Sequence, residues 1–400
     1  MPQRHQRAFL TLFLCLICVG LGQSMLFAIL PPAARSLGLT PFQVSTIFAA
    51  SATIWVFVSP MWGRRSDVMG RRPVILIGLL GFAASMVLLA SMIQIGLAGL
   101  LPAAVVYPLM VASRCVFALF GSGTGPASQA YIADRTDPVD RPAGLAMLNA
   151  AFALGQTFGP AMGALLSLVS LLFPLYASAA LAVVSGTVIW FLLPEDGPPM
   201  QESASGQRKL SFRDPRVVPF FLLDCCVQAV RATTTITLAF FLQDKLGLGA
   251  TQTARYAGIG FSVQALAGLF AQLFIVQRMR PTARQMIFAG IPISLVGCLL
   301  LALRGPYAAD LAAMAALGVG LGLLRPGSSA GASLSVEPEE QGAVAGLSGA
   351  IGVTGNIFGP LLGTGLYSVT PLAPFLLNAL VMVLALAFAR TNRRIRYLRG

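Results

Sequence analysis

The stretch Gly155-Gln-Thr-Phe-Gly-Pro-Ala-Met-Gly163 recurs 200 residues later in a closely similar form, Gly355-Asn-Ile-Phe-Gly-Pro-Leu-Leu-Gly363. Three further pairs of residues match at the same offset: Pro126 and Pro326, Ala130 and Ala330, Pro174 and Pro374. Internal repeats that enclose a binding site between them are common in secondary transporters. The repeat therefore predicts two related halves and favours transport as the function.

The overall composition indicates that the chain lies in a membrane. Of its 400 residues, 56% are hydrophobic and only 10% are charged, whereas soluble domains carry about 25% charged residues. In lipid, backbone polar groups must bond to each other, which leaves only helices or closed barrels. Barrel strands alternate apolar and polar residues. The apolar runs here are long and unbroken, so they predict an all-α integral membrane protein.

Twelve apolar runs are long enough to cross a bilayer, for which about 20 residues are needed. They cover residues 9–30, 43–62, 73–94, 99–133, 142–169, 172–193, 217–243, 252–277, 284–303, 308–335, 342–369 and 371–390. We expect twelve transmembrane helices in two pseudo-symmetric six-helix bundles. The polar stretch from Pro194 to Pro215 predicts a cytoplasmic linker. The predicted domains are therefore an N-terminal bundle over 1–193, a linker over 194–215 and a C-terminal bundle over 216–400.

The placement of basic residues predicts the orientation. If the loops alternate between the two sides, 20 of the 27 lysines and arginines lie on the side of the N-terminus. The opposite side carries four: Arg35, Lys245, Arg255 and Arg304. Cytoplasmic loops are enriched in such residues, so we expect both termini in the cytoplasm of a multi-pass protein of the bacterial inner membrane. The net charge of +13 reflects these loops, and no nucleic-acid partner is expected.

Several other classes of function are disfavoured. The six cysteines lie within apolar runs, and His5 is the only histidine. No spacing of Cys and His resembles a metal site, and no G-x-x-x-x-G-K-[ST] nucleotide loop is present. We therefore expect neither an enzyme nor a nucleotide-driven pump, and neither a metal nor a cofactor.

Charged residues inside the predicted helices mark candidate functional positions, because such residues are costly in lipid and usually functional. Asp224 is the only acid that we place well inside the bilayer. Asp224, Gln228 and Arg231 share one helix face at positions i, i+4 and i+7. Since seven residues span about 10 Å, Gln228 or water would have to bridge the two charges. We predict that Asp224, with Arg114, couples transport to protons; the alternative for Asp224 is a structural ion pair or a residue at headgroup level.

Other polar side chains within apolar helices are predicted to line a substrate cavity, because facing lipid would be costly. These candidates are Gln23, Arg114, Asn149, Gln156, Gln228, Arg231, Arg325, Asn356 and Asn378. For the amides among them, the alternative is that they only join neighbouring helices.

Three motifs resemble the drug:proton antiporters of the major facilitator superfamily, and within them the tetracycline/proton antiporters. Gly63-Arg-Arg-Ser-Asp67-Val-Met-Gly70-Arg71-Arg72 is similar to the superfamily signature G-x-x-x-D-R-x-G-R-R, with Val68 in place of a basic residue. Arg114 to Gly123 is similar to the R-x-x-x-x-x-x-G-x-G pattern associated with proton coupling. The stretch Gly155 to Gly163 resembles the antiporter motif. The resemblance implies the twelve-helix fold and proton-coupled export.

The same motifs predict a conformational switch. Gly63 and Gly70 are expected to permit tight turns, and Asp67, supported by Arg71 and Arg72, is expected to latch onto the positive N-terminus of the eleventh helix. Simple anchoring by positive charge is the alternative. The glycines and prolines of the repeated stretch, Gly155, Gly159, Pro160, Gly359 and Pro360, are expected to act in close helix packing, in hinge bending, or in both.

The predicted function is alternating-access export of a small molecule, driven by protons and most consistent with drug or antibiotic efflux. An importer on the same fold is disfavoured by the antiporter motif. An anionic metabolite, such as a carboxylate siderophore, is an alternative substrate because three arginines outnumber Asp224 and guanidinium groups bind carboxylates well. The expected partners are the substrate, protons and the lipid bilayer, and the protein is expected to act as a monomer.

Overall fold

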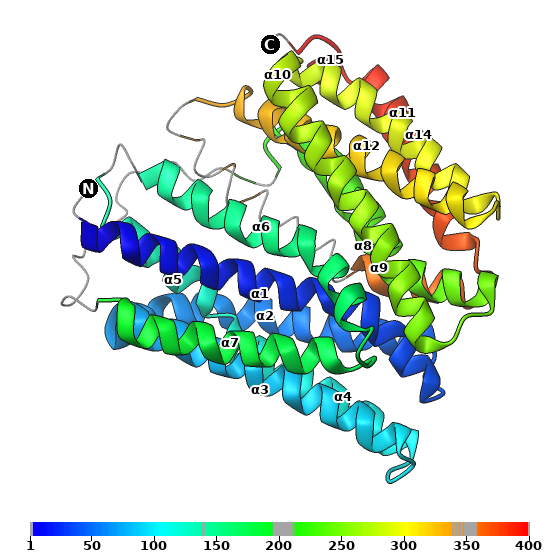
Figure 1. Ribbon diagram of the computed structural model, residues 1–400. Coiled ribbons are helices and arrows are strands. Elements are labelled where there is room, and N and C mark those ends of the chain that lie inside the picture. The colour runs from blue at the N-terminus through cyan, green and yellow to red at the C-terminus, as the bar shows by residue number, and fades with distance from the viewer. Residues whose placement is uncertain are drawn as a thin grey trace. The chain divides into compact units, whose positions relative to one another are not determined.

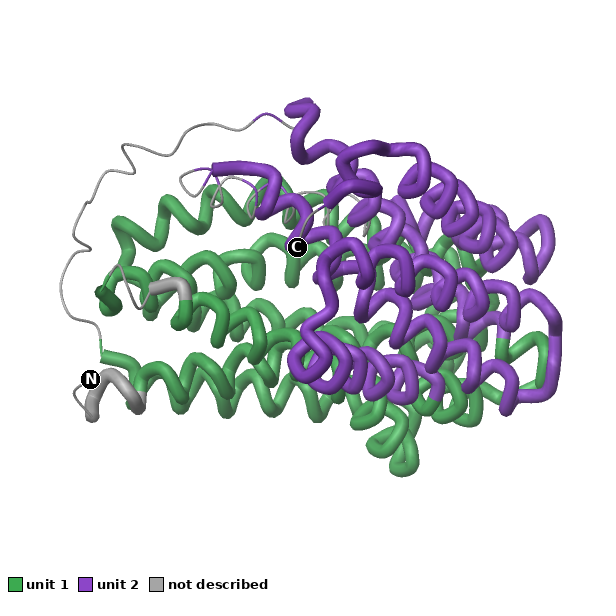
Figure 2. The backbone as a smooth tube through the Cα atoms, turned by 90° about the horizontal axis from the view of Figure 1, so that it is seen from above, with its two compact units in different colours: residues 1–202, 242–259 green, residues 203–241, 260–400 purple. Residues whose placement is uncertain are grey.

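The protein is described from a computed structural model that covers residues 3–137, 141–194, 211, 213–337, 340, 344, 347 and 358–398. Every regular element in this part of the chain is a helix (Figure 1). The chain divides into two units: unit 1 contains residues 1–202 and 242–259, and unit 2 contains residues 203–241 and 260–400 (Figure 2).

Unit 1 begins with three long helices and ends with another two. They are α1 (Gln3–Ser36), α2 (Pro41–Met69), α3 (Arg71–Leu97), α6 (Arg141–Leu166) and α7 (Phe173–Leu192). Between α3 and α6, the fourth span is built from α4 (Ala103–Val116), the π-helix η1 (Phe117–Gly121) and α5 (Thr124–Ala133). These elements correspond to the first six predicted spans. Most ends agree to within a few residues, but α1 is six residues longer than predicted at each end and α2 is seven residues longer at its C-terminal end.

Unit 2 contains the later spans. Its elements are α8 (Val218–Leu246), α9 (Ala250–Phe270), the π-helix η2 (Ala271–Val276), α10 (Gln277–Met279), α11 (Ala283–Ala302), α12 (Tyr307–Ser333), α14 (Ala373–Thr391) and the short α15 (Arg393–Arg396). The last turn of α8 and the first part of α9, residues 242–259, group with unit 1.

Ten of the helices in the described part of the chain are long and apolar enough to cross a membrane. Of the two other predicted spans, the fifth is occupied by α6. In the eleventh, residues 344, 347 and 358–367 are helical, residues 368 and 369 form a turn, and the other residues of that span lie outside the described part of the chain. The linker prediction also falls largely outside them.

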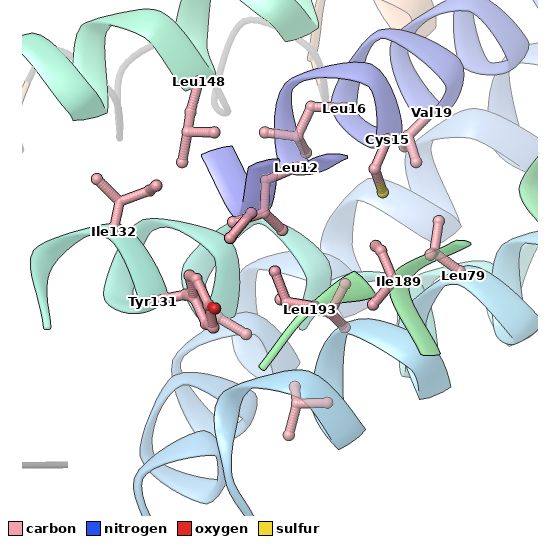
Figure 3. Packing of buried hydrophobic residues seen from close by; sticks show 14 of the residues in the cluster. Leu12, Cys15, Leu16, Val19, Leu79, Tyr131, Ile132, Leu148, Ile189 and Leu193 are labelled. Atoms are coloured by element: carbon pink, nitrogen blue, oxygen red, sulfur yellow. The ribbon is translucent and has the colours of Figure 1, made fainter. Parts of the chain in front are cut away.

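The core of unit 1 is an apolar cluster between helices that are distant in sequence. Leu12 and Leu16 from α1 meet Leu148 from α6 and Leu193 beyond α7, together with Tyr131 from α5 (Figure 3). Outward-facing positions remain apolar as well: Phe57 and Phe191 each expose 76% of their surface. Apolar side chains on both faces of a helix are expected where lipid is the solvent.

Candidate functional site

Asp224 lies half-buried on α8 in unit 2. Arg231 of the same helix and Arg325 of α12 both interact with it electrostatically. Gln228, which exposes only 4% of its surface, accepts a hydrogen bond from Arg231 Nε at 3.2 Å. The predicted shared face of Asp224, Gln228 and Arg231 is therefore present, and α12 adds a third charge. The cluster combines one carboxylate with two guanidinium groups.

Arg114 in unit 1 is in a different situation. It exposes 5% of its surface at the end of α4, and its guanidinium lies over the ring of Phe117 at 4.8 Å. Its Nε and Nη1 atoms have no hydrogen-bond partner among the described residues. The span Ala103–Ala133 contains no acidic residue. A buried charge without a counter-charge is costly, which singles Arg114 out as a position where a bound group would supply the missing partner.

The repeated glycine stretch has the same packing role in both units. A Cβ on Gly159 would lie 2.6 Å from Leu21 O and 3.0 Å from Ser24 Cβ. A Cβ on Gly359 would lie 3.5 Å from Ala229 O and 2.7 Å from Ala232 Cβ. Only glycine lets the helix backbones approach this closely, as is common between membrane helices.

The next glycine of the stretch extends this correspondence. Gly163 packs against Met25, and Gly363 packs against Thr233. The glycines are related by an offset of 200 residues, while their partners on α1 and α8 are related by 208. This register places Gln23 of unit 1 at the position of Arg231 in unit 2, and Leu16 at that of Asp224. The charge cluster is therefore a feature of unit 2 that the repeat does not duplicate.

The predicted cavity amides differ in their surroundings. Gln23 and Gln156 are half-buried on α1 and α6, and Asn149 is exposed on α6. Asn378 exposes 2% of its surface and donates from Nδ2 to Thr234 Oγ1 at 3.1 Å, so its amide joins α14 to α8. This bond fits the helix-joining alternative for Asn378. Asn356 lies outside the described residues.

The predicted turn between the second and third helices is present at only one of the two glycines. Gly70 has φ of +93° and separates α2 from α3. This backbone conformation favours glycine. Gly63 lies inside α2, where a Cβ would meet Pro126 at 3.8 Å. The expectation of a tight turn at Gly63 is therefore wrong, because the helix continues through it for six more residues.

Arg71 organises the charges beside this turn. It is hydrogen-bonded to Asp67 and donates to Ser66 Oγ at 2.6 Å. Its Nε also donates to Asp134 Oδ2 at 2.9 Å, just beyond the end of α5. Arg72 instead lies over the ring of Trp190 on α7 at 4.8 Å. Sequence reasoning missed Asp134, because no periodicity relates it to the motif.

Unit 2 contains a second cluster that sequence reasoning missed. Arg216, just before α8, donates to Glu340 Oε2 at 2.9 Å and Oε1 at 3.0 Å, and to Asp214 Oδ2 at 2.8 Å. The hydrogen bonds from Arg216 lower the pKa values of both carboxyl groups. Another missed acid is Asp310, in the first turn of α12, which exposes 1% of its surface.

An ion pair also joins the ends of two helices in unit 1. Arg35, near the end of α1, approaches Asp244, in the last turns of α8, with Nη1 and Oδ1 2.7 Å apart. Each side chain retains 32% exposure. Residues 218–241 of α8 belong to unit 2. The ion pair therefore involves only the end of α8 that groups with unit 1.

Comparison with known proteins places the chain in a family. The model of the Major Facilitator Superfamily matches residues 12–281 and 221–397. The class C tetracycline resistance protein of Escherichia coli is 29% identical over 375 residues, which are 88% of this chain and 86% of that protein. Multidrug resistance protein 1 of Bacillus subtilis (strain 168) is 27% identical over 374 residues, 92% of this chain and 91% of that protein.

A solved structure has the same fold. The crystal structure of the nucleoside transporter NupG superposes with a TM-score of 0.73 at 15% identity, and the match covers 96% of this chain and 99% of that one. The family model spans both units, and the predicted twelve-helix, two-bundle architecture agrees with the superposition. The chain belongs to the major facilitator superfamily and is a multi-pass membrane transporter, similar to the superfamily's drug:proton antiporters.

Proposed function

We propose that this protein is a secondary active exporter that moves small molecules out of the cell by alternating access, in exchange for protons. The similarity to a tetracycline resistance protein and to a multidrug resistance protein over about nine-tenths of the chain supports drug or antibiotic efflux. The glycines of the antiporter motif on α6 pack closely against α1, which is consistent with this function. Its expected site of action is the inner membrane, with both termini in the cytoplasm, as a monomer.

The observation that carries proton coupling is the electrostatic interaction of Asp224 with two arginines, Arg231 and Arg325. A nearby arginine favours the ionised form of a carboxyl group, and moving the arginine away favours protonation. Arg325 is on a different helix from Asp224. A substrate or a helix movement that brings either arginine closer to Asp224 would therefore release a proton, and withdrawal of the arginine once the substrate has left would load one. Gln228 would hold Arg231 in place when Asp224 is protonated.

Arg114 supports a second candidate function. Its buried guanidinium lacks hydrogen-bond partners on Nε and Nη1 within the described part of the chain, and a planar guanidinium binds carboxylates in a bidentate manner. These two atoms lie on different edges of the guanidinium, so a substrate carboxylate would accept a hydrogen bond from one of them and a second acceptor would serve the other. On this reading the protein exports an anionic metabolite, such as a carboxylate siderophore.

The conformational switch is proposed to use the loop charges and the repeated glycines. Asp67 is held by Arg71 and keeps 56% of its side chain exposed, so it is accessible for a second contact. We assign the latch to Asp67 and Arg71. Arg72, on α3, supports it by packing against Trp190 of α7. Gly155, Gly159, Pro160, Gly359 and Pro360 would let the helices of each unit move as one body.

Transport by purified protein in proteoliposomes under an imposed pH gradient tests this proposal. Tetracycline, a cationic dye and a tricarboxylate siderophore are offered to wild type, to Asp224→Asn and to Asp310→Asn, which is the matched control for a buried carboxyl group of unit 2. Gradient-driven movement of tetracycline or the dye, lost only in Asp224→Asn, is expected. Movement of the siderophore alone would favour the anion exporter, and movement independent of the gradient would refute proton coupling.

A further inference from the structure

One end of unit 2 carries a concentration of exposed positive charge. Figure 1 shows α10 and α15 at this end. The exposed arginines of these helices and their flanking residues are Arg278, Arg280, Arg284, Arg390, Arg393, Arg394 and Arg396. We call this set the basic end of unit 2. At the opposite end of unit 2, the described residues include one basic residue, Arg304.

The C-terminal part of the basic end is a folded element attached to the bundle. The Asn392 side chain accepts a hydrogen bond from Arg394 N at 3.0 Å and caps α15. Ile395 is completely buried, whereas Arg393 and Arg396 on either side of it are exposed. Burial of one apolar residue therefore fixes the short helix and presents its arginines at the surface.

The charges of the basic end are not neutralised by ion pairs with the residues that the structure describes. None of its seven arginines forms an ion pair within the described part of the chain. The nearby acids Asp214 and Glu340 are already bonded to Arg216. Of the seven arginines, Arg394 interacts electrostatically with Asp214. A partner with several negative charges would therefore meet arginines that are free to bind it.

Aromatic rings place this charge at the level of the membrane surface. Arg278 lies over Phe274 at 6.0 Å, and Arg396 lies over Tyr397 at 5.5 Å. Phe274 exposes 53% and Tyr397 66% of its surface. Aromatic residues next to basic ones are typical of the interface between hydrocarbon and headgroups. The basic end therefore has the composition expected beside lipid headgroups.

We propose that the basic end of unit 2 is a binding surface for anionic phospholipid headgroups. Clusters of four to eight basic residues beside a transmembrane helix attract anionic lipids, with a contribution from each residue near the surface. The phosphodiester oxygens accept hydrogen bonds from guanidinium groups in a fixed geometry. This surface lies outside the transport site and does not depend on the identity of the substrate.

Native mass spectrometry of the full-length protein in a mild detergent tests this proposal. Phosphatidylglycerol and phosphatidylcholine with the same acyl chains are titrated into wild type. The same titration is made with three variants: a triple glutamine variant (Arg393→Gln, Arg394→Gln, Arg396→Gln), a triple lysine variant at the same positions, and Arg304→Gln as the control from the opposite end. Thermal unfolding of each variant checks its fold.

Wild type, Arg304→Gln and the triple lysine variant are expected to bind phosphatidylglycerol in preference to phosphatidylcholine. The triple glutamine variant is expected to bind phosphatidylglycerol roughly tenfold or more weakly. Raising the salt concentration should weaken the preference of wild type, because exposed charges are screened. Equal binding of the two lipids to wild type, or unchanged phosphatidylglycerol binding in the triple glutamine variant, would overturn the proposal.

Discussion

Arg71 and Asp134 are joined by a hydrogen bond of 2.9 Å between Nε and Oδ2, although 63 residues separate them in sequence. The bond attaches the start of α3 to the end of α5, and Arg71 also holds Asp67. The signature loop is therefore fixed by two carboxylates rather than one. A charged hydrogen bond of this partly exposed kind contributes about 1 kcal/mol.

The first prediction concerns this pair. Asp134→Asn should leave Arg71 bonded to Asp67 alone, lower the thermal stability slightly and slow transport, because the loop loses one of its two anchors. Asp137→Asn, three residues further along the chain, is the control and should behave like wild type. Unchanged transport and stability in Asp134→Asn would show that the bond has no role in the switch.

The second prediction concerns the ion pair of Arg35 and Asp244. Arg35→Asp and Asp244→Arg should each slow transport, because two like charges then face each other across the same contact. The double variant restores opposite charges and should recover transport. Arg304→Asp is the control for reversal of an exposed arginine. If the double variant is no better than the single variants, the ion pair itself has no role in transport.

The third prediction separates close packing from general intolerance of substitution. Gly159→Ala would place a Cβ 2.6 Å from Leu21 O, so α1 and α6 must move apart. Such overpacking should lower the free energy of unfolding by about 1–3 kcal/mol. Gly125→Ala is the matched control, since a Cβ there has open space. Thermal melting in detergent compares the two, and equal melting temperatures would contradict the packing described for the repeated stretch.

The fourth prediction is a pH dependence. Hydrogen bonds from Arg216 hold the pKa values of Asp214 and Glu340 below their usual 3.8 and 4.5. Groups with lowered pKa values stabilise the folded state above those usual values, and this stabilisation is lost as the pH falls through the lowered ones. Glu340→Gln should therefore lower the melting temperature at pH 7, and the difference from wild type should shrink below about pH 4.5.

Glu337→Gln is the control for this pH experiment. Glu337 is exposed, and it donates a hydrogen bond to Glu340 from its backbone N and not from its side chain. Its substitution should leave the melting temperature unchanged at every pH. A difference between wild type and Glu340→Gln that stays constant from pH 7 to pH 3 would contradict the assigned role of the Arg216 cluster.

The helices were predictable, but the pairings between them were not. Long apolar runs determine where a chain crosses lipid, so the predicted spans agree with the observed helices to within a few residues at most ends. Asp224, Gln228 and Arg231 were placed together because helical periodicity relates residues of one helix. No periodicity relates α8 to α12, so the addition of Arg325 to this cluster depends on tertiary packing.

Gly63 shows the opposite kind of failure. A glycine in a loop motif suggests a turn, yet α2 continues past Gly63, and of the two glycines only Gly70 has a backbone conformation that favours glycine.

Asp134 and Glu340 were missed for the same reason as Arg325, because each is brought to its arginine by long-range packing. The equivalence of Gln23 and Arg231 likewise required the glycine contacts, since it follows an offset different from that of the repeated stretch.

The central claim is that Asp224 exchanges its proton when substrate binds, and proton release measures this directly. Purified protein in a lightly buffered detergent solution is mixed with a transported substrate, and the pH change is recorded. Wild type and Asp310→Asn should release protons on binding, whereas Asp224→Asn should bind the substrate without releasing any. Proton release from Asp224→Asn equal to that of wild type would contradict the account and assign the coupling to another group.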